Sequence, residues 1–134
     1  MMRKTHIAIG CLATSILLSN HIVQPLSIIG IIGATFPDID CKVGIKHRTI
    51  THSILILILS SLLIRFSNKD IALVWFANYL LHLVSDSFTK SGVPFLYPFV
   101  KRKYGPKLIK TGSSIDYFIT IVCIYIFSEI LILI

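Results

Sequence analysis

Five strongly apolar segments, separated by short polar stretches, restrict what this chain can fold into. They run over Thr5–Ser19, Ile22–Phe36, Ser53–Phe66, Ile71–Ser85 and Ile115–Ile134. Only the last reaches the roughly 20 residues that an α-helix needs to cross the hydrocarbon core of a bilayer. The others are a few residues shorter, a length that core helices and re-entrant segments also have.

The composition decides how these segments are covered. Hydrophobic residues make up 54% of the 134 residues and charged residues only 14%, against about 25% charged in a typical soluble domain. The mean hydropathy is +0.83. Too few polar side chains remain to coat a water-soluble domain, so we expect lipid around the chain. Backbone groups in lipid must be paired within the segment, which predicts an all-α membrane bundle of about five short transmembrane helices in a single domain, 1–134.

Polar residues and prolines mark the ends of the predicted helices. Asn20-His21 predicts a tight turn between the first two helices, and Pro37 ends the second because the residue before a proline is disfavoured in α geometry. Ser67–Asp70 predicts a short turn. The stretch 86–114 holds three prolines and three glycines, which is typical of a long loop.

The basic residues are distributed unequally over the two sides of such a bundle. Five spans place the N-terminus and the loops 37–52 and 86–114 on one side, together with eleven of the 13 basic residues. The other side holds Arg65 and Lys69. Under the positive-inside rule the basic side is cytoplasmic, which predicts a multi-pass protein of the inner, or cytoplasmic, membrane. The membrane therefore explains the net charge of +7, and we expect no direct nucleic-acid partner.

Histidine and aspartate side chains gather at the same predicted face. Five helix ends meet there, as a site between the helices of a bundle requires. The candidate residues at this face are His6, Asp38, Asp40, His47, His52, His82, Asp86 and Asp116.

His82 and Asp86 are the pair whose spacing most clearly indicates a shared site. Their i,i+4 spacing places both on one face of the predicted fourth helix, with Asn78 one turn further along. Ionisable groups in a membrane segment are costly and by default indicate function. The competing interpretation is a hydrogen-bonded pair that only fixes helix packing.

The loop between the second and third helices supplies further candidates. Asp38 and Asp40 could bind a metal, or one could act as a base, and an Asx turn or helix cap is the structural alternative. His47 and His52 could turn toward one centre. Arg48 between them could hold a phosphate, or it is one more basic residue of the cytoplasmic face.

The ordered motifs resemble those of a known family. They are Thr5-His6 with Gly10, Pro37-Asp38-Ile39-Asp40, His47-Arg48-Thr49-Ile50-Thr51-His52-Ser53, and His82 to Thr89 with Gly92 and Tyr97-Pro98. In this order and spacing they resemble the YdjM-like family of inner-membrane metal-dependent hydrolases, over most of the chain. The resemblance implies an all-α membrane protein with a metal site and hydrolytic activity.

Mixed nitrogen and oxygen ligands favour a transition metal, with Zn²⁺ first and Mn²⁺ or Fe²⁺ as alternatives, one or two ions per chain. We predict His52, Asp40, His82 and Asp86 as inner ligands, supported by His6 and His47. Asp38 is expected to steer a proton from the activated water and Arg48 to stabilise an anionic phosphoester. A site near the headgroup layer favours a phospholipid or another amphiphilic phosphorylated substrate. A metal-ion transporter and a non-catalytic structural or partner-binding membrane protein remain the alternatives.

Overall fold

The computed structural model describes residues 1–40 and 48–133, and within these residues it is all-helical. The α-helices are α1 (Arg3–Ser19), α3 (Ile54–Ser67), α4 (Lys69–Ser87) and α5 (Ser114–Leu133). Three 3₁₀-helices complete the set: η1 (Pro25–Ala34), η2 (Phe36–Ile39) and η3 (Ile50–His52). Extended pairing is limited there to two isolated bridges, Thr89 with Ile109 and Val93 with Tyr104. The predicted all-α class is thereby confirmed.

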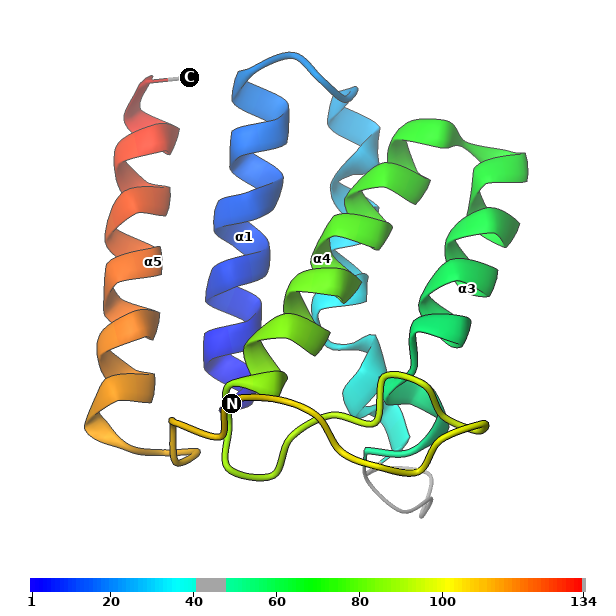
Figure 1. Ribbon diagram of the computed structural model, residues 1–134. Helices are drawn as coiled ribbons and strands as arrows, with labels where there is room; N and C mark the ends of the chain where they lie inside the picture. Colours follow the sequence, from blue (N-terminus) through cyan, green and yellow to red (C-terminus); the bar gives the residue numbers. More distant parts are fainter. Residues whose placement is uncertain (41–47, 134) are drawn as a thin grey trace.

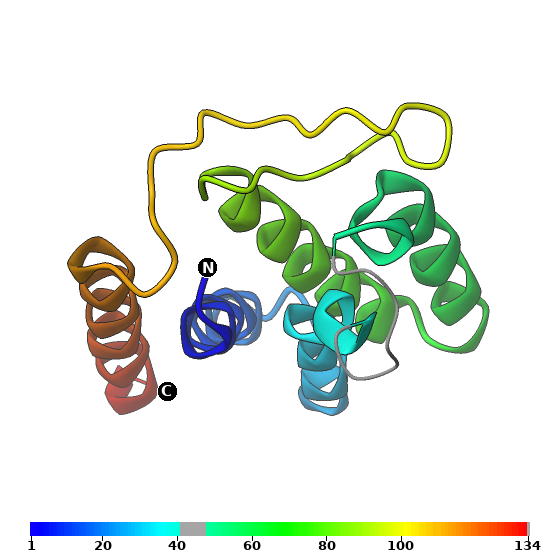
Figure 2. The same ribbon diagram turned by 90° about the horizontal axis from the view of Figure 1, so that it is seen from below.

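Helix α4 lies at the centre of the arrangement. It packs against η1, α3 and α1, whereas α5 packs against α1 at the edge (Figure 1). The loop from α4 to α5 lies at the end where α1 begins and α4 ends, and it runs along one edge of the bundle in the view from below (Figure 2). The N-terminus, the end of η1 and the start of α5 therefore all lie at one level of the molecule.

The second predicted helix is a 3₁₀-helix instead of an α-helix. In 3₁₀ geometry residues i and i+3 lie on the same side, which places Gly30 and Gly33 together against α4. A Cβ at Gly30 would lie 2.7 Å from the backbone nitrogen of Trp75, and one at Gly33 would lie 2.6 Å from the Trp75 carbonyl oxygen. The missing side chains let the two backbones approach closely, a packing mode common between helices in membranes.

Most of the predicted boundaries agree with the observed ones. Asn20 follows α1, with His21 at a φ of 53° in the turn. Asn68 separates α3 from α4 and caps α4 by accepting hydrogen bonds from the Asp70 and Ile71 amides. Ser53 caps α3 by accepting from the amide of Ile56. Each cap pairs a backbone group that a helix end leaves open.

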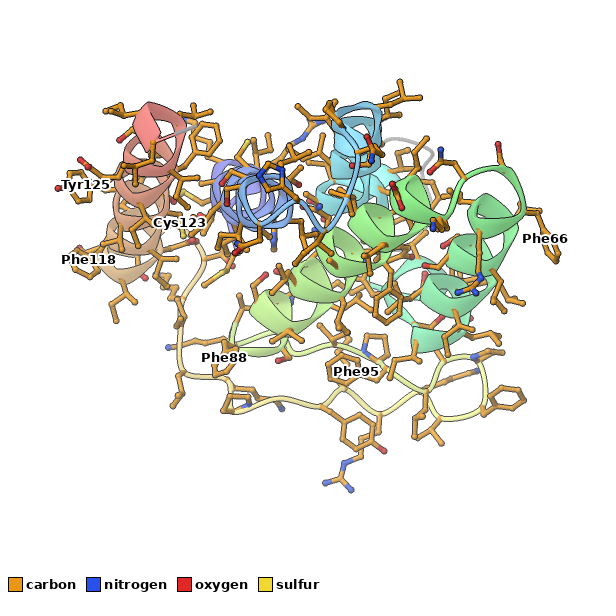
Figure 3. The ribbon with its side chains drawn as sticks, turned by 90° about the horizontal axis from the view of Figure 1, so that it is seen from above. Phe66, Phe88, Phe95, Phe118, Cys123 and Tyr125 are labelled. Carbon is orange, nitrogen blue, oxygen red and sulfur yellow. The ribbon has the colours of Figure 1, made fainter. Side chains whose placement is uncertain are left out.

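The interior is more polar than the surface. Among the described residues, 17 polar or charged residues are buried against 9 hydrophobic ones. The small apolar core is formed by Leu57, Tyr79, Leu83 and Val93. Large apolar side chains face outward instead: Phe118 and Tyr125 of α5 project away from the bundle in the view from above (Figure 3), and both are more than half exposed. This distribution is the reverse of that in a soluble domain and suits an apolar solvent.

One described helix, α5, is long and apolar enough to cross a membrane. Helix α3 and η1 are apolar but shorter, while α1 and α4 carry nine of the 17 buried polar residues described. Length and composition therefore single out α5 as a span, and the five-span arrangement predicted from the sequence goes beyond what they establish.

Candidate metal centre

Three histidines from three different elements converge at the end of α4 that faces the loop. His6 comes from the first turns of α1, His52 from the end of η3 and His82 from the last turns of α4. All three side chains are at most 2% exposed. The rings of His6 and His82 are stacked, with centroids 3.8 Å apart, and His52 meets His82 edge-on at 5.4 Å.

His82 is oriented by a backbone carbonyl. Its Nδ1 lies 2.7 Å from the carbonyl oxygen of Ala34, and a carbonyl oxygen can only accept a hydrogen bond. Nδ1 must therefore carry the proton, which leaves Nε2 of the neutral ring with a lone pair. That Nε2 faces two carboxylates, 3.6 Å from Asp38 Oδ1 and 3.9 Å from Asp86 Oδ2.

His6 is fixed in the same way through a serine. The hydroxyl of Ser85 donates to the His82 carbonyl at 3.0 Å, which uses its only hydrogen. Since Ser85 Oγ also lies 3.1 Å from His6 Nδ1, the histidine must be the donor of that second contact. Nε2 of His6, which carries the lone pair in the neutral ring, then faces Asp86, with 3.2 Å to Oδ1.

His52 repeats the arrangement with a threonine. Thr51 donates its hydroxyl proton to Asp40 Oδ2 at 2.9 Å, so its oxygen accepts from His52 Nδ1 at 3.2 Å. Nε2 of His52 lies 3.6 Å from Asp86 Oδ2 and 3.9 Å from Asp38 Oδ1. All three rings therefore hold Nδ1 outward and turn Nε2 toward Asp86, and the Nε2 atoms of His52 and His82 also face Asp38.

This geometry fits a divalent metal ion. A lone pair that faces a carboxylate is repelled unless a cation lies between them, and the Nε2 atoms of His6 and His82 are buried without a hydrogen-bond partner of good geometry among the described residues. Two ligand atoms about 2.1 Å from a tetrahedral zinc ion stand roughly 3.4 Å apart, close to the separations seen. The ligand atoms fall within 4.8 Å of one another in two groups, His6 with His82 and Asp86, and Asp38 with His52 and His82.

The two aspartates of the Pro37–Asp40 stretch take different positions. Asp38 lies beside the Nε2 atoms, and its side chain is 21% exposed. Asp40 is fully buried at the outer nitrogen of His52, 3.6 Å from Nδ1, and accepts from the Arg48 amide at 3.0 Å. The structure therefore groups Asp38 with the candidate ligands and sets Asp40 behind a histidine. The sequence predicted Asp38 as the base and Asp40 as a metal ligand, and both roles stay predictions.

Arg48 contacts the cluster directly and is 7% exposed. Its Nη2 lies 2.9 Å from Asp86 Oδ2, while Nη1 donates to Thr89 Oγ1 at 2.9 Å and to the Gly92 carbonyl at 3.1 Å. The residue adopts a φ of 60°, a conformation that costs energy outside glycine and clusters at functional sites. The Met1 amino group also donates to Asp86 Oδ1.

Two candidate residues from the sequence are still to be accounted for. His47 lies outside the described residues. Asp116 is buried at the start of α5, where Oδ1 accepts from the Thr5 hydroxyl at 2.6 Å and Oδ2 from the amides of Met2 and Gly112, each at 3.0 Å. Thr5 also contacts Thr120 at 2.8 Å. Asp116 therefore ties α5 to α1.

Sequence reasoning did not identify Ser85, Thr51 and the Ala34 carbonyl as the groups that orient the histidines. Ser85 carries a local signal, since it follows His82 by three residues on the same face of α4. Thr51 is adjacent to His52, but adjacency alone does not indicate that its hydroxyl accepts a hydrogen bond from the ring. A backbone carbonyl such as that of Ala34 leaves no trace in residue identity.

Fold and cluster together define an all-helical membrane protein with a buried histidine–aspartate site. The family described as YdjM inner membrane protein matches residues 1–133, and the chain belongs to this family. It is also 29% identical to YvsG, an uncharacterised protein of Bacillus subtilis (strain 168), over 133 residues that cover 84% of this chain and 83% of the relative. No solved structure matches the chain.

Proposed function

We propose that the chain is a multi-pass membrane hydrolase that uses a divalent metal ion, zinc in the first place, to cleave a phosphoester of a lipid or another amphiphile. The observation that carries the proposal is the common orientation of the three histidines. Each Nδ1 is bound to an outer acceptor, so each Nε2 turns toward Asp86, and those of His52 and His82 also face Asp38. A cluster built only for packing would pair the Nε2 atoms of His6 and His82 with hydrogen-bond donors.

The residues of the cluster would divide the work between them. A bound divalent ion would supply a Lewis acid and make a water molecule more acidic. His6, His52, His82 and Asp86 would hold it, while Ser85, Thr51 and the Ala34 carbonyl keep the rings in place. Asp38, partly exposed at 21%, can take up a proton from the attacking water and pass it to solvent. Arg48 would hold Asp86 in position by its contact at 2.9 Å.

The membrane part of the proposal rests on the distribution of polar residues. Among residues 1–40 and 48–133, buried polar side chains outnumber buried apolar ones, 17 to 9, and the apolar surfaces of α3 and η1 lie outside with that of α5. We therefore place the short helices in the bilayer beside α5, with the metal centre and the basic loop at the cytoplasmic headgroup layer. A substrate with an apolar part and a phosphate would reach the site along the membrane surface.

The test is metal analysis of the protein purified in neutral detergent, followed by an assay on phosphoesters. We expect wild type to bind close to one or two zinc ions per chain and to hydrolyse a short-chain phospholipid. His82→Ala/Asp86→Ala should lose both properties. The matched control is His21→Ala/Asp70→Ala, which removes the same residue types at the opposite helix ends.

The outcomes separate the alternatives. Wild-type protein without metal after reconstitution with zinc and manganese would overturn the proposal and favour a packing or partner-binding role. Bound metal without turnover on any phosphoester, but with metal flux into vesicles, would favour a transporter. Equal loss of metal in the control pair would show that the site assignment is wrong.

A further inference from the structure

A second polar feature lies next to the metal centre, on the far side of Arg48. It is a pocket of about 280 Å³ lined by Arg48, Thr49, Pro94, Tyr97, Lys101 and Lys103. Three of the six lining residues are cationic, and none of the six is acidic. We call it the loop pocket, because four of its residues belong to the loop between α4 and α5.

We propose that the loop pocket binds the phosphate group of an amphiphile, and so places the substrate of the proposed hydrolase beside the metal centre. The inference that this ligand is the substrate rests on the proposed function. The binding site itself does not, because the pocket is formed by residues other than the histidines and aspartates of the cluster.

The charges favour an anion with several acceptor oxygens. Arg48 offers a planar donor group that matches phosphate geometry, and Lys101 and Lys103 are exposed cations at the same pocket. Tyr97 adds a hydroxyl that can donate to a phosphate oxygen. A neutral or cationic ligand would not pair with the charges of Lys101 and Lys103.

The size of the pocket favours a headgroup over a whole lipid. Its volume of about 280 Å³ falls just below the lower limit of about 300 Å³ for pockets that enclose a drug-sized ligand. The pocket can therefore hold a phosphate and a small attached group, while acyl chains remain outside. Exposed apolar residues lie along the same loop, including Leu96 and Phe99 at 50% and 83% exposure, and can enter the bilayer beside such chains.

The position of the loop agrees with a headgroup ligand. The loop crosses the molecule at the end where α5 begins (Figure 2), and α5 is the helix that can span a bilayer. The Ile54 amide holds the loop to the start of α3 by donating to the Phe95 carbonyl at 2.9 Å. Within the loop, Val93 and Tyr104 exchange backbone hydrogen bonds at 2.9 Å in both directions. The pocket is therefore a fixed part of the fold at the level of the membrane surface.

Arg48 connects the pocket to the metal centre. Arg48 lines the pocket, its guanidinium contacts Asp86 Oδ2 at 2.9 Å, and Asp86 belongs to one of the two candidate ligand groups. A phosphate in the pocket would thus lie one side chain away from the cluster. This arrangement suits a site that recognises a phosphate and acts next to it.

The experiment measures binding on metal-free protein in neutral detergent with a chelator present, by calorimetry. The probes are inorganic phosphate, dihexanoyl phosphatidate and, as the uncharged control, dihexanoylglycerol. We expect the phosphatidate to bind, binding to weaken at high salt, and dihexanoylglycerol not to bind. Tighter binding of phosphatidate than of inorganic phosphate assigns the pocket to a lipid headgroup, and equal binding assigns it to a free phosphate group.

The variant Lys101→Gln/Lys103→Gln should weaken binding by about tenfold, since two charge-assisted contacts are lost. Lys90→Gln/Lys110→Gln removes the same charge from exposed positions of the same loop outside the pocket, and should bind like wild type. Absence of phosphate binding, or equal weakening by both pairs, would overturn the proposal.

These measurements test the phosphate site and the proposed hydrolase independently of each other. The zinc content of Lys101→Gln/Lys103→Gln should equal that of wild type, and His82→Ala/Asp86→Ala should still bind phosphatidate. Lysine-dependent binding in a protein that takes up no metal would leave the loop pocket standing and overturn the proposed hydrolase. Metal uptake and turnover without lysine-dependent binding would support the proposed hydrolase and overturn the loop pocket as a phosphate site.

Discussion

Arg48 and His6 approach the same carboxylate, that of Asp86, at its two different oxygens. Nη2 of Arg48 lies 2.9 Å from Oδ2, and Nε2 of His6 lies 3.2 Å from Oδ1. The Asp86 side chain is 2% exposed, so water does not solvate its negative charge. These partners and the Met1 amino group surround the carboxylate instead. The pair of Arg48 and Asp86 is consequently a buried ion pair at the border between the loop pocket and the metal centre.

Arg48→Met should destabilise the metal-free protein by about 3–5 kcal/mol, because it leaves a buried charge without its main partner. Zinc should restore part of this loss, since a cation at the cluster again compensates Asp86. The measurement is denaturant unfolding in detergent with and without zinc. A loss that is the same in both conditions would contradict the coupling between Arg48 and the cluster.

Ser85→Ala should weaken zinc binding by about 10- to 100-fold, because the hydroxyl that orients His6 is removed while the ligands remain. Ser87→Ala is the matched control: Ser87 is also buried in α4 and donates to a carbonyl three residues earlier, that of Val84 at 2.6 Å, without contacting a histidine. Competition against a zinc chelator gives both affinities. Equal affinities of the two variants would show that the serine does not orient the ring.

Asp116→Ala should destabilise the protein by about 1–3 kcal/mol and leave zinc content unchanged. The substitution removes the acceptor of the Thr5 hydroxyl and of two backbone amides, and unpaired buried donors are costly. Ser128→Ala, at an exposed position of α5, serves as the control. Loss of zinc from a folded Asp116→Ala protein would place Asp116 in the metal centre after all.

Gly33→Ala should destabilise the packing of η1 on α4 by about 1–3 kcal/mol, because its new Cβ would lie 2.6 Å from the Trp75 carbonyl oxygen. Val84→Ile adds one carbon to α4 at a position that is 40% exposed and should change stability by less than about 0.5 kcal/mol. Thermal unfolding in detergent compares the two. If both variants unfold like wild type, the close approach of η1 and α4 is not a constraint.

The sequence predicted the parts of the site that residue identity and spacing encode. The i,i+4 spacing placed His82 and Asp86 on one helix face, and the shared membrane side brought His6, Asp38 and His52 to the same level. The 3₁₀ geometry of Pro25–Ala34 was missed, because apolar content alone does not distinguish it from an α-helix. The closeness of Gly30 and Gly33 to the backbone of α4 depends on tertiary packing.

The positions of Asp38 and Asp40 also could not be predicted from the sequence. Two carboxylates separated by one residue look equivalent in a sequence, yet one faces the Nε2 atoms and the other lies behind His52. The turn of the backbone in η2 decides between them, and no local signal specifies it. Arg48 likewise is of a residue type that usually lies at the surface, but here it is buried and contacts Asp86, Thr89 and Gly92.

The three histidines are contributed by α1, η3 and α4, and their orienting groups by η1, α4 and the residue before His52. No single segment carries a complete set of ligands, so an unfolded chain would bind a metal ion far more weakly than the native one. An ion that binds only the native arrangement adds its binding free energy to the stability of the whole bundle. Metal supply would then set how much of this protein persists in the membrane, in addition to any reaction that it performs there.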